Sequence, residues 1–130
     1  MERHTRQRAA IRQVIETARR PLSTQEILEL AQSSVPGMGI ATVYRNVKAL
    51  LDERDIDQVS LPGEAPRYER ARQPHHHHFQ CTRCQRVFDV FACPGGIQQM
   101  VPPGFVLEHH EVTLYGRCGE CSSQQGPLGT

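Results

Sequence analysis

The chain has 130 residues, of which 38% are hydrophobic and none is Trp, and its 15 basic and 14 acidic side chains give a formal net charge of +1. This length allows one or two small domains. With so few apolar residues each hydrophobic core would be small and would need further stabilisation, such as a bound metal ion. No run of eighteen apolar residues is present, which argues against a membrane-spanning helix, and no charged-then-apolar leader opens the chain. We therefore expect a cytoplasmic protein whose five cysteines are thiolates rather than disulfides.

Basic residues are concentrated in the first third of the chain. Residues 1–48 contain eight basic and four acidic side chains, whereas the remainder contains seven basic and ten acidic ones. A cationic front on a nearly neutral chain suits a polyanionic partner at one end. A solvated helix surface is the alternative explanation for the same charges.

Three helices are predicted in the first part of the chain. The first covers residues 5–19, where apolar residues recur at helical spacing. Ser23 followed by Glu26 forms a capping box, which predicts that a second helix begins there. The third covers residues 40–51, whose apolar side chains form one continuous stripe.

Two short strands, residues 56–61 and 66–70, are predicted after the helices, around a Pro-Gly turn. Three helices followed by a hairpin outline a winged helix-turn-helix domain, which we assign to residues 1–72. Tyr44 lies on the apolar stripe of the third helix, so core packing is its default interpretation, but we also include it among the candidate DNA contacts. The other face of that helix presents side chains that can reach phosphates or base edges, namely Thr42, Arg45, Asn46 and Lys48.

The rest of the chain predicts a small, mostly β domain, which we assign to residues 73–122 after a polar linker. A short helical turn is predicted at residues 97–101, and residues 123–130 have the composition of a disordered tail. The predicted fold class is therefore α+β. Strands are predicted at residues 75–81, 87–91, 105–108 and 111–116.

Two Cys-x-x-Cys pairs, Cys81 with Cys84 and Cys118 with Cys121, give the strongest chemical signal. Two thiolates at this spacing can bind one tetrahedral ion, and four of them fill the coordination shell of Zn²⁺. Because 33 residues separate the pairs, the ion would clip together a whole β domain, and we expect a structural zinc site. Four buried unliganded thiols, or two disulfides, are the alternatives.

Four consecutive histidines, His75 to His78, precede the first cysteine pair. Alternate side chains of a strand point to opposite faces, so His75 and His77 would serve one metal site, and His76 and His78 another. A polar loop or a purification tag is the alternative explanation. Further ligands must come from elsewhere, and the candidates are Asp57, Glu69, Asp89, Cys93, His109 and His110.

Several strings of residues resemble the ferric uptake regulator (Fur) superfamily of bacterial metalloregulators. They are Thr5-x-Gln7-Arg8, Ala41-Thr-Val-Tyr-Arg45, the histidine run with its Phe-Gln-Cys-Thr-Arg-Cys, and Leu114-Tyr-Gly-Arg-Cys118-Gly-Glu-Cys121. The resemblance covers residues 3–121. It implies an N-terminal winged helix, a C-terminal α/β dimerisation domain, and a homodimer that binds operator DNA and represses genes when it is loaded with metal.

The resemblance also implies roles for single residues. The four paired cysteines match the structural zinc site. His76 and His78 match two ligands of a sensing site at the hinge between the domains. Glu69 stands where iron-sensing members have a carboxylate ligand, and Asp57 where some zinc-sensing members have a hinge aspartate.

A further site in the dimerisation domain is matched by His75, His77 and His110. Asp89 matches a carboxylate ligand of iron and peroxide sensors, and we include it in this site. The chain departs from the family pattern in two places. Pro21 replaces a histidine usual in iron and peroxide sensors, which weakens the peroxide-sensing interpretation. The glutamate expected in the dimerisation-domain site is missing, and Cys93 is the nearest substitute. A thiolate there would favour zinc over iron or manganese.

The predicted function is a zinc-responsive repressor that acts as a homodimer on palindromic double-stranded DNA. Arg45 and its neighbours would enter the major groove, and Arg3 or Arg6 would contact the backbone or the minor groove. A zinc hydrolase is a remote alternative, because no HExxH pairing is present, and a zinc-ribbon module that binds protein is another. The first alternative is a regulator that responds to Fe²⁺, Mn²⁺ or peroxide through Glu69, His76, His78 and Asp89.

Overall fold

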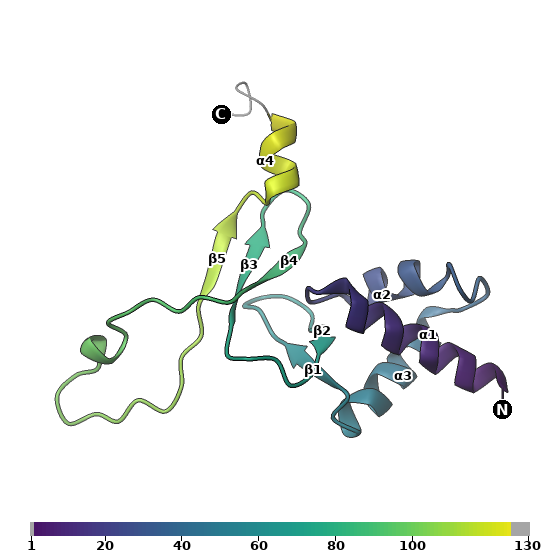
Figure 1. The fold of residues 1–130 in the computed structure, drawn as a ribbon, viewed down its shortest axis with the longest axis horizontal. Helices are drawn as coiled ribbons and strands as arrows, with labels where there is room; N and C mark the ends of the chain where they lie inside the picture. The colour runs from purple at the N-terminus through teal and green to yellow at the C-terminus, as the bar shows by residue number, and fades with distance from the viewer. Residues whose placement is uncertain (1, 126–130) are drawn as a thin grey trace.

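The computed structural model describes residues 2–125, which form two lobes (Figure 1). The N-terminal lobe contains α1 (Glu2–Ala18), α2 (Thr24–Ala31), α3 (Ile40–Asp52) and a hairpin of β1 (Ile56–Val59) and β2 (Arg67–Arg70). The C-terminal lobe contains β3 (His77–Cys81), β4 (Val87–Val90), β5 (Thr113–Gly116) and α4 (Gly119–Gln125). No helix in the described part of the chain is long and apolar enough to cross a bilayer.

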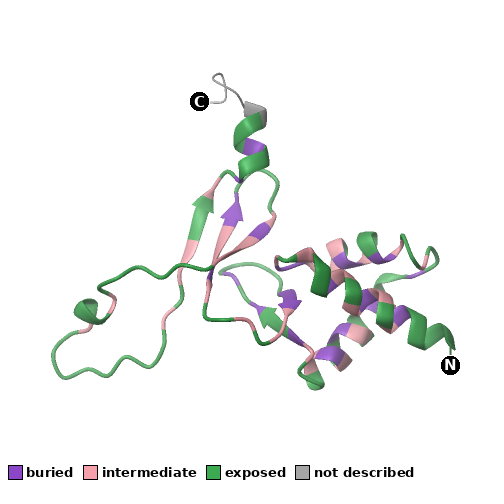
Figure 2. Cartoon of the chain, viewed as in Figure 1, coloured by how far each residue is buried: buried purple, intermediate pink, exposed green. Residues whose placement is uncertain are grey.

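The three predicted helices are confirmed, and they share one apolar core (Figure 2). Each helix turns part of its apolar side chains inward, and removing this surface from water is the main favourable term in the stability of the lobe. The buried side chains are Ile11, Ile15, Leu22, Ile27, Ala31, Met38, Val43, Val47, Leu50, Ile56 and Tyr68.

The predicted capping box begins α2. The Glu26 amide donates to Ser23 Oγ at 3.1 Å, and the Ser23 amide donates to Glu26 Oε1 at 3.0 Å. Such a cap stabilises a helix by about 1 kcal/mol. It also fixes the Glu26 carboxylate at the start of α2, beside the hairpin.

β2 faces both lobes because its side chains alternate. Tyr68 points into the helical core, and its backbone exchanges two hydrogen bonds of 2.8 Å with Leu22. Arg67 and Glu69 point the other way and are buried against residues of the C-terminal lobe. The hairpin is antiparallel, with Asp57 opposite Glu69.

The C-terminal sheet has the strand order β4-β3-β5. β3 and β4 are antiparallel, with His78 opposite Asp89, whereas β3 and β5 are parallel. The 3-10 turn at Gln98–Met100 confirms the predicted helical turn. α4 continues to Gln125, so residues 123–125 are helical rather than part of the predicted tail, and residues 126–130 lie outside the described residues.

The predicted strand at residues 105–108 is wrong. These residues lie in the long segment between β4 and β5, and Phe105 and Val106 are 68% and 86% exposed. Two prolines and Gly104, which has a φ of +85°, precede them. β-propensity reflects packing against neighbouring strands, and this segment pairs with no strand among the described residues.

The interior of the C-terminal lobe is small. Its buried cluster consists of Cys81, Cys118 and Cys121, with Phe88 packed against them. A second small cluster, formed by Val59, Leu61 and Val87, joins the hairpin to β4. A lobe whose core is mostly sulfur lacks the apolar surface that usually stabilises a domain.

Candidate metal centres

Three groups of potential metal ligands lie in and beside the C-terminal lobe, and within each group the ligand atoms are within 4.8 Å of one another. We name them the cysteine cluster, the hinge cluster and the loop cluster. The cysteine cluster is Cys81, Cys84, Cys118 and Cys121; the hinge cluster is Glu69, His76, His78 and Asp89; the loop cluster is His75, His77, Cys93 and His110.

The cysteine cluster has the spacing of a tetrahedral zinc site. Two of its sulfur atoms, on Cys84 and Cys118, are 3.9 Å apart. Four sulfurs at 2.3 Å from one ion would be separated by about 3.8 Å. The five cysteines are all free thiols, so the disulfide alternative does not describe this structure. The four residues therefore fit Zn²⁺.

Electrostatics in this cluster also favour a cation. Burial raises the pKa of Cys81, but the backbone amides of Cys84 and Cys118 lower it more, to about 5. Burial and the neighbouring thiols raise the pKa of Cys121 to about 12. Without an ion one thiolate suppresses ionisation of the others, whereas a divalent cation would stabilise all four.

The hinge cluster draws Glu69 from β2 of the N-terminal lobe and the other three residues from the C-terminal lobe. His76 Nε2 lies 2.9 Å from Glu69 Oε2 and 3.4 Å from Asp89 Oδ1. His78 Nε2 lies 3.8 Å and 3.5 Å from the same two oxygens. Tetrahedral nitrogen and oxygen ligands about 2.0–2.1 Å from an ion would be about 3.4 Å apart. The spacing again fits a metal.

Burial makes the hinge cluster costly as it stands. The Glu69 and Asp89 side chains are 6% and 3% exposed. Three of its atoms, Glu69 Oε1, His78 Nε2 and Asp89 Oδ1, are buried without a hydrogen-bond partner among the described residues. Buried polar atoms that lack partners destabilise a protein, and a cation between them would supply the missing interactions.

The carboxyl groups of Glu69 and Asp89 cannot both ionise easily, because their ligand atoms lie within 4.8 Å of each other. Burial raises the pKa of Glu69, but interactions with His78, Asp89 and His76 outweigh it and lower this pKa to about 2. Burial and the Glu69 carboxylate raise the pKa of Asp89 to about 7. Burial lowers the pKa of His76, but the Pro74 carbonyl and Glu69 raise it further than burial lowers it.

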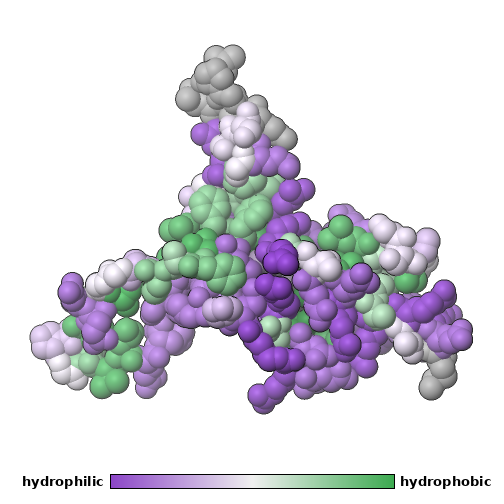
Figure 3. All heavy atoms as spheres, in the orientation of Figure 1, coloured by the Kyte–Doolittle hydropathy of each residue, from purple (hydrophilic) through white to green (hydrophobic). Residues whose placement is uncertain are grey.

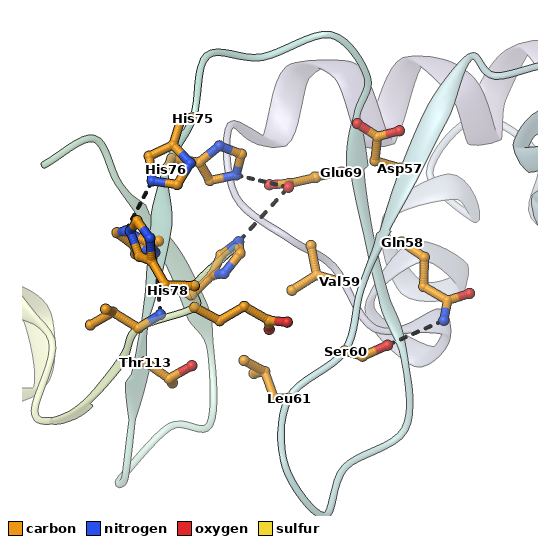
Figure 4. A pocket seen from close by; sticks show the side chains of 14 residues that line it. Asp57, Gln58, Val59, Ser60, Leu61, Glu69, His75, His76, His78 and Thr113 are labelled. Atoms are coloured by element: carbon orange, nitrogen blue, oxygen red, sulfur yellow. Dashed lines mark hydrogen bonds and ion pairs between the residues drawn. The ribbon is translucent and has the colours of Figure 1, made fainter. Parts of the chain in front are cut away.

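The ligand set of the hinge cluster differs from the preferred prediction and has the residues named for the iron- or peroxide-sensing alternative. Asp89 lies with Glu69, His76 and His78 rather than with the loop cluster. Asp57, on β1, lines a cleft together with Glu69, His76 and His78, but its carboxylate is outside the ligand set (Figure 4). The register explains the first difference, because β3 pairs with β4 such that His78 lies opposite Asp89.

The loop cluster joins β3 to the long segment between β4 and β5. His77 Nε2 lies 3.1 Å from His75 Nε2 and 3.4 Å from Cys93 Sγ, and Cys93 Sγ lies 3.1 Å from His110 Nε2. Burial and then the neighbouring histidines lower the pKa of His77, which favours the neutral ring that a metal needs. Three imidazoles and a thiolate are a set that suits zinc.

One hydrogen bond in the loop cluster was not foreseen from the sequence. The Val112 amide donates to His77 Nδ1 at 3.2 Å, so Nδ1 is an acceptor and the neutral ring carries its proton on Nε2. Binding a metal through Nε2 requires that proton to move to Nδ1. The contact between residues 77 and 112 must therefore change when this cluster is filled through Nε2.

A cleft of about 510 Å³ contains all four consecutive histidines, from His75 to His78, and it is also lined by Glu69 and His110 (Figure 4). Consecutive residues just before and at the start of β3 thus supply two clusters. Any shift of β3 would act on both of them.

Residues predicted to contact DNA lie in the N-terminal lobe. Arg3, Arg6, Arg45 and Lys48 are exposed, and Thr42 and Asn46 are half-buried. Tyr44 is 56% exposed, so the core role expected for it is wrong. Val43 and Val47 fill the inward direction of α3, and Tyr44 is rotated by about 100° from Val43.

The profile of the "Ferric uptake regulator family" matches residues 2–115. This chain belongs to the ferric uptake regulator family. The family consists of transcriptional regulators rather than enzymes.

Relatives in the family carry names that refer to iron, peroxide or manganese. The "Ferric uptake regulation protein" of Campylobacter jejuni is 34% identical over 95 residues, which cover 70% of this chain and 60% of that protein, so the chain spans less than two thirds of this relative. The "Peroxide operon regulator" of Bacillus subtilis is 27% identical over 127 residues, which cover 95% of this chain and 86% of that protein. A solved "zinc-bound manganese uptake regulator" is 27% identical with a TM-score of 0.75, covering 86% of this chain and 87% of that chain.

Replacing Cys121 with Ser should remove about one zinc ion per chain from this Fur-family protein and unfold the C-terminal lobe, because the sulfurs form its core. Elemental analysis and amide hydrogen exchange of β3 and β5 would measure both effects. Ser122→Ala is the matched control, since Ser122 is the exposed neighbour of Cys121 and belongs to none of the three clusters. Retention of protected strands in zinc-free Cys121→Ser would contradict the prediction.

Zinc affinity of the hinge cluster should rise between pH 6 and pH 8. Asp89, with a pKa of about 7, and His76, with a raised pKa, hold protons at pH 6 that a metal must displace. Glu69, with a pKa of about 2, is ionised throughout and adds no dependence. Each displaced proton contributes up to about tenfold per pH unit.

Competition with a chelator, in His110→Ala protein to weaken the loop cluster, would measure this slope. Asp89→Asn is the informative variant, because it removes one titrating group and should flatten the slope. A zinc affinity that is the same at pH 6 and pH 8 would refute the prediction.

Proposed function

We propose that this chain is a zinc-responsive transcriptional repressor that binds palindromic operator DNA as a homodimer. The observation that carries the proposal is the division of the hinge cluster between the lobes. Glu69 comes from the hairpin of the N-terminal lobe, and His76, His78 and Asp89 come from the C-terminal lobe. An ion held by all four residues would fasten the lobes together.

The N-terminal lobe has the parts of a winged helix-turn-helix domain, with α3 as the recognition helix and the β1–β2 hairpin as the wing. The exposed Arg45, Tyr44 and Lys48 on α3 suit the major groove, because arginine binds guanine edges and lysine binds phosphates. Arg3 and Arg6, exposed at the start of α1, suit backbone or minor-groove contacts.

Dimerisation would occur through the C-terminal lobe. β5 is an edge strand of the sheet, and apolar side chains are exposed on this lobe and on the long segment beside it (Figure 3). Exposed apolar surface and an open strand edge favour association with a second copy. The exposed residues include Phe91, Met100, Phe105, Val106, Leu114 and Tyr115.

Regulation would follow from a change in the population of two lobe arrangements. Glu69 can approach His76, His78 and Asp89 only when the lobes are closed, so a metal bound by all four favours the closed form. A shift from 1:99 to 99:1 needs a preference of about 5.5 kcal/mol. Closure would fix the separation of the two α3 helices in the dimer at the spacing of the operator half-sites.

Zinc is favoured by the loop cluster, in which a thiolate completes three imidazoles. One observation favours the alternative of an iron- or manganese-responsive regulator, or a peroxide sensor. The hinge cluster contains two carboxylates, and carboxylate oxygens suit Mn²⁺ and Fe²⁺ better than they suit soft ions. Relatives with each of these responses are known by name.

Zinc-dependent DNA binding should be lost when His76 and His78 are both replaced with Ala, because the C-terminal lobe then offers only Asp89 to the hinge ion. A duplex is first selected from a random pool with zinc-loaded protein, and its binding is then measured against free Zn²⁺, Fe²⁺ and Mn²⁺ under anaerobic conditions. We expect at least about a hundredfold loss of zinc-stimulated affinity, as for removal of two ligand bonds.

His109→Ala is the matched control, since His109 is exposed and outside all three clusters. Full zinc-dependent binding by the double variant would show that the hinge mechanism is wrong. Stimulation by Fe²⁺ at concentrations where Zn²⁺ has no effect, or peroxide-induced oxidation of His76 or His78, would favour the alternative.

The dimer should dissociate when Leu114 on β5 is replaced with Arg, because a charge in an apolar interface is left without a partner. Sedimentation velocity would detect the monomer. Leu30→Arg is the control, because Leu30 is similarly exposed, at 46% against 47%, but lies on α2 in the N-terminal lobe. An unchanged dimer in Leu114→Arg would place the interface elsewhere.

A further inference from the structure

A buried guanidinium forms a second connection between the lobes, away from the hinge cluster. The side chain of Arg67, on β2, is only 9% exposed. Its Nη1 donates to Glu26 Oε1 at 3.1 Å, and its Nη2 donates to the Gln85 carbonyl at 2.8 Å. Glu26 belongs to α2 in the N-terminal lobe, whereas Gln85 follows Cys84 in the C-terminal lobe.

The Gln85 carbonyl is held in position by the cysteine cluster. Gln85 has a φ of +67°, an unusual conformation for a residue with a side chain. Its amide donates to the Cys81 carbonyl at 3.0 Å, and the Cys84 amide donates to Cys81 Sγ at 3.4 Å. The turn that carries the acceptor of Arg67 is thus the turn that carries two of the four sulfurs.

The other end of the Arg67 contact is equally fixed. Glu26 Oε1 also accepts the Ser23 amide of the capping box, and Glu26 Oε2 accepts from Arg20 at 2.9 Å. Since α2 shares the helical core with α3, Arg67 connects the cysteine turn to the body that carries the candidate recognition helix.

A neighbouring pair strengthens this connection. Gln80, which is 4% exposed and precedes Cys81, donates from Nε2 to Glu64 Oε2 at 2.9 Å. Glu64 lies in the β1–β2 turn, and its Oε1 is 3.6 Å from Arg67 Nη2. The hairpin therefore contacts β3 through Glu64 and the turn that follows β3 through Arg67, and neither side chain belongs to the hinge or loop cluster.

We propose that Arg67 is a positioning residue that holds the N-terminal lobe against the cysteine turn whether or not the hinge cluster is filled, and thereby sets the metal concentration at which the protein closes. Arg67 and Glu69 lie on one face of β2, about 7 Å apart along the strand. The Arg67 contact is permanent, and the Glu69 contact depends on metal. The Arg67 contact keeps Glu69 near His76, His78 and Asp89, so that metal binding has to supply less free energy to bring these four residues together.

This inference rests on the proposed function only for its effect on DNA binding. The Arg67 contact by itself predicts how compact the protein is when metal is absent from the hinge cluster. With the hinge and loop clusters stripped by mild chelation and the cysteine zinc retained, as checked by elemental analysis, wild-type protein should stay more compact than Arg67→Met protein. Small-angle X-ray scattering would show a larger radius of gyration for the variant.

Free zinc needed for half-maximal DNA binding should rise about tenfold in Arg67→Met, the equivalent of about 1.4 kcal/mol. Binding at saturating zinc should stay within about twofold of wild type, because metal can still close the protein. A purely structural role would lower the melting temperature without changing the zinc threshold. Glu64→Ala, at an exposed position, should give a smaller rise of about threefold, and it decides the question if Arg67→Met does not fold.

Arg12→Met is the matched control, because Arg12 donates to Asp55 at 2.7 Å within the N-terminal lobe. Its zinc threshold and radius of gyration should equal those of wild type. The proposal is overturned if Arg67→Met and Glu64→Ala keep the wild-type threshold and radius, or if Arg12→Met changes them equally. If wild type shows no zinc-dependent DNA binding, the proposed function fails. The scattering comparison alone then supports or overturns the positioning role of Arg67.

Discussion

The structure of the C-terminal lobe depends on one constraint: its ionisable side chains are packed so closely that they need a cation between them. Its buried cluster is built from cysteine sulfurs, and two carboxylates and two imidazoles meet in the hinge cluster. In a low-dielectric interior such groups repel or remain unpaired. A divalent ion would turn each repulsive cluster into a set of bonds, and the free energy of metal binding would then also stabilise this lobe.

Strand alternation distributes these ligands. Consecutive histidines just before and at the start of β3 supply the hinge and loop clusters in turn, because neighbouring side chains of an extended segment point to opposite faces. On β2 the same rule directs Tyr68 into the helical core and Arg67 and Glu69 toward the C-terminal lobe. One short strand is therefore packed into one lobe and fastened to the other.

The contacts between the two lobes differ in whether they require a metal ion in the hinge cluster. The apolar contact of Val59, Leu61 and Val87 and the Arg67 contact with Gln85 need only a folded cysteine turn. The hinge cluster needs a further ion to satisfy its unpartnered atoms. A protein with permanent and conditional contacts at one interface can respond to metal without losing the interface, because the permanent ones limit how far the lobes separate.

Local patterns in the sequence determined the helices, the capping box at Ser23 and Glu26, the paired cysteines and the alternation of the histidines, since each depends on residues close in the chain. Tertiary structure decided what depended on distant partners. Asp89 joined the hinge cluster through the register of β3 with β4, Tyr44 stayed exposed because valines fill the core side of α3, and residues 105–108 found no strand to pair with. Arg67 reads as one more arginine in the sequence, and only folding brings it to a carbonyl in the cysteine turn.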